Sequence, residues 1–225
     1  MNDTQKKIKG EISETELLKT IEWRLEETIA AFTVSSLTNE NCDKNPELHK
    51  LINDWNGFWK PLTIGLETTV IVGIYAMVDS RDDCATLLSV YNNLKNNKQL
   101  PSDFPQEFEE KLKDIQKRYS KYRNKVYAHT DKEREKHSIN GFTYETIAQD
   151  LDELKYALKV LWHVHGDGIP DKSSTKEMIY NCDLYISHVK ENTSGFLAKL
   201  ADKAPDLSND SGESSSDFLK WLLPV

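Results

Sequence analysis

One short segment of the chain combines side chains that could act on a phosphodiester. Arg123 and His129 lie six positions apart, with Asn124 directly after the arginine. The imidazole of a histidine exchanges a proton near neutral pH, and the guanidinium of an arginine stays charged and can bind two phosphate oxygens. Each residue taken alone has a simpler explanation, because a histidine on an apolar stripe often belongs to the core and an arginine beside it often forms an ion pair.

The charge around this segment differs from that of the rest of the chain. Residues 111–136 contain ten Lys or Arg and four Asp or Glu, so this window carries +6 and the remainder −14. The net charge of −8 argues against a surface that binds polyanions everywhere, so any contact with RNA must be local. Lys117, Lys121 and Lys125 are the candidates to bind an RNA backbone, and Tyr127 could stack on a base, although packing is its default role. Alternatively, the lysines solvate the outer face of a helix and the tyrosine packs.

A long amphipathic helix from about Pro105 to Thr130 is predicted to position these residues. Its apolar stripe recurs at steps of four and three, with His129 on the stripe and Arg123 at its flank; the other members are Phe108, Leu112, Ile115, Tyr119, Tyr122 and Val126. A similar stripe follows Thr143, which should cap the next helix, and comprises Ile147, Leu151, Leu154, Leu158, Leu161 and His165. Two such stripes favour packing of the two helices on each other.

The rest of the chain also predicts helices. A capping box at Ser13–Glu16 should start the first, and Pro46 precedes the second. Pro61 should open a third helix, and the run 79–83 should end it and cap a fourth. We find no alternation of period two that would indicate a sheet. The predicted fold class is therefore all-α, an up-and-down helical bundle.

The third predicted helix needs separate treatment because residues 61–78 are just long and apolar enough to span a membrane. Glu67 and two glycines interrupt this stretch. The amphipathic helices elsewhere in the chain could surround it. We therefore expect a fully buried helix and no membrane contact.

Together, R123-N-K-V-Y-A-H129 resembles the signature of the HEPN family, an arginine followed by a polar residue and, a few residues later, a histidine on the same helix. The upstream apolar segment 65–79, GLETTVIVGIYAMVD, and the ending Ala128-His129-Thr-Asp131 resemble the abortive-infection (AbiU-type) HEPN branch. The resemblance covers about residues 10–165. We expect these residues to form the HEPN-like bundle.

This resemblance implies a homodimer with two motifs across its interface, and cleavage of RNA without a metal or other cofactor. RNA supplies its own 2′-hydroxyl nucleophile. His129 would then transfer the proton, Arg123 would stabilise the phosphorane, and Asn124 would orient the phosphate or His129. The predicted function is an endoribonuclease, a toxin or phage-defence effector. Alternatives are a non-catalytic HEPN module that binds nucleotide, RNA or a partner protein, and a structural adaptor in which Arg123 and His129 are buried and paired.

Metal and redox sites are not expected. His163, His165 and Asp167 are ligand types, but side chains two apart on a helix diverge. The chain has three widely spaced cysteines, Cys42, Cys84 and Cys182, an odd number with no CxxC pair. Its first residues do not have the pattern of a secretory leader. We expect a cytoplasmic protein.

The C-terminal part of the chain is expected to differ from the bundle. Residues 174–203 should form a further helix that packs on it, with a possible break near Gly195. Residues 204–225 should form a flexible linker, rich in Ser, Asp, Asn and Gly from Pro205 to Asp217, and an apolar tail, Phe218–Val225. The tail either folds back or binds a partner, such as an antitoxin.

Overall fold

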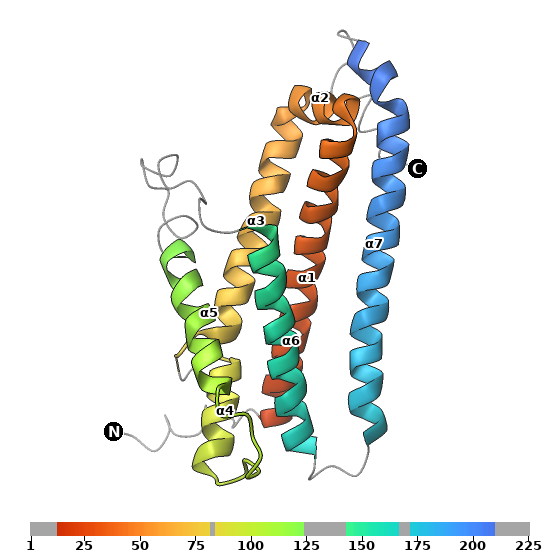
Figure 1. Ribbon diagram of the computed structural model, residues 1–225. Helices are drawn as coiled ribbons and strands as arrows, with labels where there is room; N and C mark the ends of the chain where they lie inside the picture. Colours follow the sequence, from red (N-terminus) through yellow and green to blue (C-terminus); the bar gives the residue numbers. More distant parts are fainter. Residues whose placement is uncertain (1–12, 82–83, 124–142, 167–171, 210–225) are drawn as a thin grey trace, which may run out of the picture.

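The computed structural model describes residues 13–81, 84–123, 143–166 and 172–209, and within them it contains seven helices and no strand (Figure 1). Five long helices run alternately up and down, and a short helix lies at each end of the bundle. The long helices are α1 (Glu14–Lys44), α3 (Asn56–Val78), α5 (Phe108–Tyr122), α6 (Tyr144–Gly166) and α7 (Lys172–Asn209), and the short ones are α2 (Pro46–Asp54) and α4 (Leu87–Asn96). The prediction of an all-α bundle with a further C-terminal helix is confirmed.

Predicted local signals begin three of these helices. At the start of α1, the Ser13 hydroxyl accepts a hydrogen bond from the Glu16 backbone N–H at 3.2 Å, and the Glu16 carboxylate accepts one from the Ser13 N–H at 3.0 Å. The Thr143 hydroxyl accepts from the Thr146 N–H at 3.1 Å at the start of α6. Pro46 is the first residue of α2, where its missing N–H costs no hydrogen bond.

Two predicted boundaries are wrong. Helix α3 begins at Asn56, so Pro61 lies inside it rather than opening it. Trp59 is buried with Leu200 and Ala204 of α7, and this packing stabilises the turn before the proline. The acidic run 79–83 ends α3 but does not cap α4, whose cap is Thr86.

Only part of α3 is buried. By length and hydropathy it is the single described helix that could cross a membrane, with a mean hydropathy of 1.6 over an 18-residue window of which 28% is buried. Burial is concentrated near its C-terminal end, at Ile74, Met77 and Val78, whereas Leu62 and Val72 are exposed. The prediction of a fully buried helix is therefore wrong, because the helices that pack on α3 leave Leu62 and Val72 exposed.

The two predicted apolar stripes enter a common core instead of packing mainly on each other. Helix α5 packs chiefly against α3, and α6 chiefly against α1. Leu112, Ile115 and Tyr119 of α5 and Leu154 and Leu161 of α6 are almost fully buried in this core. Charged pairs, rather than the two stripes, link α5 to α6 directly.

Helix α7 continues without a break through Gly195 and through Pro205 to Asn209. The first six residues of the predicted linker, 204–209, are therefore helical. Helix α7 packs mainly on α1 and α2, and a second apolar cluster joins it to α2 and α3. The predicted apolar tail, Phe218–Val225, lies outside the described residues.

Helices α1 and α3 approach each other closely at Gly73. A Cβ atom at Gly73 would lie 2.1 Å from the Oγ1 of Thr28 and 3.2 Å from its Cβ. Thr28 is only 1% exposed, and its hydroxyl donates to the Arg24 carbonyl at 2.7 Å. No space remains for a side chain here, so a glycine is required by packing rather than by backbone conformation.

Gly73→Ala should therefore destabilise the protein by about 1–3 kcal/mol, because the overpacking cost exceeds the gain in helix propensity. Gly195→Ala is the matched control, since nothing lies within 4 Å of the added Cβ in α7. It should stabilise the protein by about 0.5–1 kcal/mol. Urea unfolding of both variants measures the difference, and equal effects would show that the α1–α3 contact is not tight.

Candidate functional site

The structure holds Arg123 against a core helix. This residue directly follows α5, is half-buried, and its Cζ lies 5.2 Å from the centre of the Tyr75 ring on α3. A guanidinium over an aromatic face is stabilised by a cation–π interaction. Tyr75 belongs to the segment 65–79 that accompanied the motif in the sequence, but no local pattern identified it as the partner of Arg123.

The other predicted motif residues cannot be placed in the same way. Asn124, Lys125, Tyr127 and His129 lie outside the described residues, in the segment 124–142. Of the predicted site, the structure therefore places Arg123, Lys117 and Lys121, all at the end of α5.

The basic charge of α5 is neutralised mainly in its first turns. Lys111 forms an ion pair with Glu153, and Lys113 with Glu109. By contrast, Lys117 and Lys121 are exposed and have no acidic partner within the described ranges. These two lysines are four apart on a helix, a spacing at which like charges repel. Uncompensated positive charge therefore gathers at the end of α5 that leads to Arg123.

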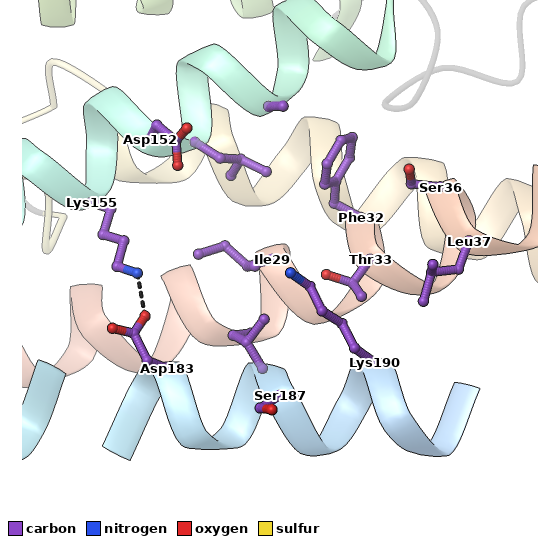
Figure 2. Close-up of a pocket in the computed structure, with 13 residues that line it drawn as sticks. Ile29, Phe32, Thr33, Ser36, Leu37, Asp152, Lys155, Asp183, Ser187 and Lys190 are labelled. Carbon is purple, nitrogen blue, oxygen red and sulfur yellow. Dashed lines mark hydrogen bonds and ion pairs between the residues drawn. The ribbon is translucent and has the colours of Figure 1, made fainter. Parts of the chain in front are cut away.

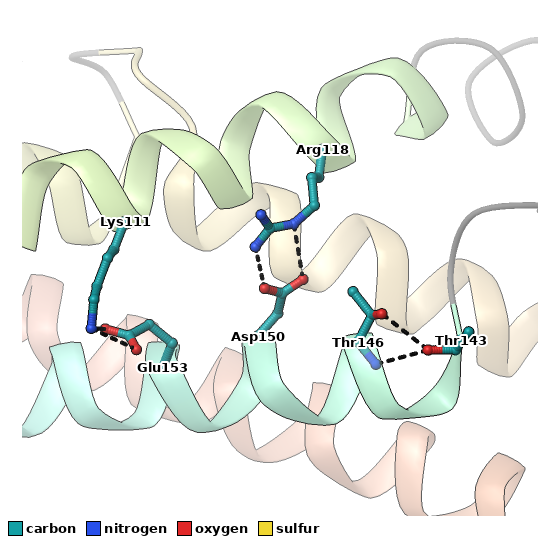
Figure 3. A network of polar contacts seen from close by, with 6 residues as sticks. All are labelled: Lys111, Arg118, Thr143, Thr146, Asp150 and Glu153. Carbon is teal, nitrogen blue, oxygen red and sulfur yellow. Dashed lines mark hydrogen bonds and ion pairs between the residues drawn. The ribbon is translucent and has the colours of Figure 1, made fainter.

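A buried carboxylate fixes the same end of α5 to α6 (Figure 3). The Nε of Arg118 donates to one oxygen of Asp150 at 3.4 Å, and an η nitrogen donates to the other oxygen. Asp150 is only 5% exposed, whereas the Arg118 side chain is 44% exposed. A two-point contact of this kind restricts rotation of α5 about its axis. It therefore sets the direction in which the chain continues to Arg123.

Tyr119 lies in the core beside the Arg118–Asp150 pair. Its side chain is fully buried, and this burial, together with the neighbouring Asp150 carboxylate, raises the pKa of its phenol. The phenol therefore stays neutral at physiological pH. One signal in the sequence could have identified this cluster, since Asp150 is a charged residue at helical spacing between Ile147 and Leu154 on the apolar side of α6.

The far end of the segment 124–142 is anchored as well. Tyr144, the first residue of α6, has its hydroxyl 3.0 Å from that of Ser35 and accepts a hydrogen bond from the Asn39 side chain. Its ring lies 5.8 Å from that of Phe32. The described residues on either side of the segment 124–142 are thus held on different helices, Arg123 on α3 and Tyr144 on α1.

The histidines considered as metal ligands have other surroundings. The Nε2 of His165 lies 2.9 Å from the Thr15 hydroxyl, and its Nδ1 lies 3.5 Å from the Glu14 carboxylate. His163 is exposed, and Asp167 lies outside the described residues. In the described part of the chain, no three His, Cys, Asp or Glu side chains are grouped to hold a metal.

Comparison with known proteins gives one match. The chain matches the model of the HEPN AbiU2 family over residues 13–188. The match includes α1 to α6 and the first part of α7, and so continues beyond residue 165, where the resemblance in the sequence was expected to end. No curated protein and no solved structure matches the chain.

Arg118→Ala should destabilise the protein by about 2–3 kcal/mol, because it leaves the buried Asp150 carboxylate without its cation. The additional change Asp150→Asn should recover part of this loss by removing the charge. Lys113→Ala is the control on the same helix, and should cost about 1 kcal/mol or less because its pair with Glu109 is exposed. Urea unfolding of the wild type and the three variants tests this, and no recovery in the double variant would contradict a charge-based role for Arg118.

Proposed function

The chain belongs to the AbiU2 family of HEPN proteins, and from this premise we propose that it is a metal-independent endoribonuclease that acts as a toxin in phage defence by abortive infection. The observation that carries the proposal is the position of Arg123. It is held on Tyr75 at the end of a helix whose last exposed lysines are unpaired within the described residues. Cytoplasmic RNA is the proposed substrate.

In the proposed reaction, the 2′-hydroxyl of RNA attacks the adjacent phosphorus and the bond to the 5′-oxygen breaks. His129 transfers the proton between these oxygens, and Arg123 stabilises the negative charge that develops on the phosphorane. Asn124 orients the phosphate or the imidazole. The products are a 2′,3′-cyclic phosphate and a free 5′-hydroxyl.

The contact with Tyr75 supports this role for Arg123 because it restrains the guanidinium before RNA binds. Less conformational entropy is then lost when a phosphate is bound. Lys117 and Lys121 would extend the contact along the RNA backbone, together with Lys125 and, by stacking, Tyr127. Ionic attraction at these lysines should make RNA binding weaker as salt increases.

We further propose that two copies pair along the exposed side of α3. Leu62, Gly65, Thr69 and Val72 recur there at steps of three and four, all are exposed, and none is charged. Small residues at the centre of this stripe allow two helices to approach closely. Tyr75 follows Val72 by three residues, so pairing along the stripe would bring together the two helices that hold Arg123.

The alternative is a non-catalytic HEPN module that binds RNA, a nucleotide or a partner protein. The acidic net charge of −8 favours it, because most of the surface would repel a polyanion. A partner such as an antitoxin could use the apolar tail Phe218–Val225. Binding of RNA without cleavage at any salt concentration would favour this alternative.

The purified protein should cleave RNA in the presence of EDTA and leave 2′,3′-cyclic phosphate ends. His129→Ala should lower the cleavage rate by at least about 100-fold, because it removes the proton-transferring group. His163→Ala, which changes an exposed histidine on α6, should cleave normally. Cleavage by His129→Ala at the wild-type rate would refute the assignment of His129.

Val72→Glu should convert the proposed dimer to a monomer, because it places an unpaired charge in the interface. Tyr156→Glu is the control, since Tyr156 is an exposed aromatic residue on α6. Sedimentation velocity distinguishes the two states. A wild-type monomer, or a Val72→Glu dimer, would show that this face of α3 does not mediate pairing.

A further inference from the structure

A cavity of about 510 Å³ opens between α1, α6 and α7 (Figure 2). This volume lies within the range of about 300–1,000 Å³ that is usual for small-molecule sites. Its apolar wall is formed by Ile29, Phe32, Leu37, Leu151 and Ile186. None of the residues considered for RNA cleavage lines it.

Two hydroxyl groups beside this apolar wall have no hydrogen-bond partner among the described residues. Thr28 and Thr38 of α1 both donate to the carbonyl four residues earlier, at 2.7 and 2.8 Å. Thr33 and Ser36 line the cavity, and across the described ranges neither hydroxyl makes a hydrogen bond. Thr33 as a whole is only 6% exposed, so its hydroxyl lies at the base of the cavity wall rather than on the open surface. A bound ligand could satisfy both hydroxyls.

The charges around the cavity are arranged unequally. At one end, Lys155 of α6 forms an ion pair with Asp183 of α7, and Asp152 lies one turn before Lys155. Figure 2 shows the Lys190 side chain of α7 extending into the cavity, toward Ile29 and Thr33. No acidic side chain pairs with Lys190 in the part of the protein that the structure describes. One ammonium group is therefore available beside two hydroxyls and an apolar wall.

We propose that this cavity binds a small aromatic monoanion, such as an aromatic carboxylate. Its ring would lie on Ile29, Phe32 and Ile186, and its anionic group would accept hydrogen bonds from Lys190 and from the hydroxyls of Thr33 and Ser36. A polyanion fits poorly, because Asp152 and Asp183 also border the cavity. The ligand would join α7 to α1 and α6 where few direct contacts link α6 to α7.

The test uses 1-anilinonaphthalene-8-sulfonate, an aromatic monoanion, as the probe in fluorescence titrations of the full chain. Lys190→Gln should weaken binding by about tenfold, the usual effect of losing a hydrogen bond to a charged group. Lys199→Gln, an exposed lysine of α7 outside the cavity, should leave the affinity unchanged. N-phenyl-1-naphthylamine has the same rings without the sulfonate, and its affinity should not change in Lys190→Gln.

A second variant tests occupancy of the cavity itself. Ser36→Trp should fill the space and abolish binding of the probe, with circular dichroism confirming that the helices remain. Wild-type affinity in both Lys190→Gln and Ser36→Trp would overturn the proposal, because the probe would then bind elsewhere, for example on the exposed face of α3. An equal loss for the charged and neutral probes in Lys190→Gln would overturn the role given to its charge. None of these measurements depends on RNA cleavage.

Discussion

The close contact between α1 and α3 at Thr28 and Gly73 is the constraint on which the remaining arrangement depends. These two helices form the base on which α5 and α6 pack, α5 chiefly on α3 and α6 chiefly on α1. With no side chain at Gly73, the two backbones can approach, and the core residues on either side of the contact are almost fully buried. The positions of α5 and α6 are therefore set by α1 and α3, and neither of these helices carries a residue of the Arg123–His129 motif.

That base also holds both ends of the segment that contains the rest of the motif. Arg123 rests on Tyr75 of α3, and Tyr144 is hydrogen-bonded to Ser35 and Asn39 of α1. The Arg118–Asp150 pair links α5 to α6, five residues before Arg123 and six residues after Tyr144. A buried carboxylate with a half-exposed arginine contributes modestly to stability, but it makes one rotation of α5 more favourable than others. Positioning of Arg123 is thus a property of four helices rather than of the motif alone.

The protein keeps different chemical surfaces on different sides of the bundle. Among the described residues, the end of α5 presents lysines without an acidic partner, and one side of α3 presents an uncharged stripe. Helices α1, α6 and α7 enclose a cavity into which Lys190 extends. If the proposed function holds, this separation would let an acidic protein offer a local site for RNA. It also means that a ligand in the cavity and RNA at the end of α5 would not compete for the same side chains.

The sequence by itself determined the helices, several of their caps and the concentration of positive charge, because capping boxes, apolar spacing and local charge are properties of neighbouring residues. It also identified the segment around Arg123, and the family match agrees with the resemblance found there. It failed at Pro61 and in predicting a fully buried α3, because burial of Trp59 and exposure of Val72 depend on which helices cover each side of α3. Only the tertiary structure decided the pairing of Arg123 with Tyr75, the Arg118–Asp150 contact and the cavity beside Lys190. Each of these features joins residues from separate helices. Such contacts depend on how the helices pack on one another, and the residues of any one helix do not indicate this packing.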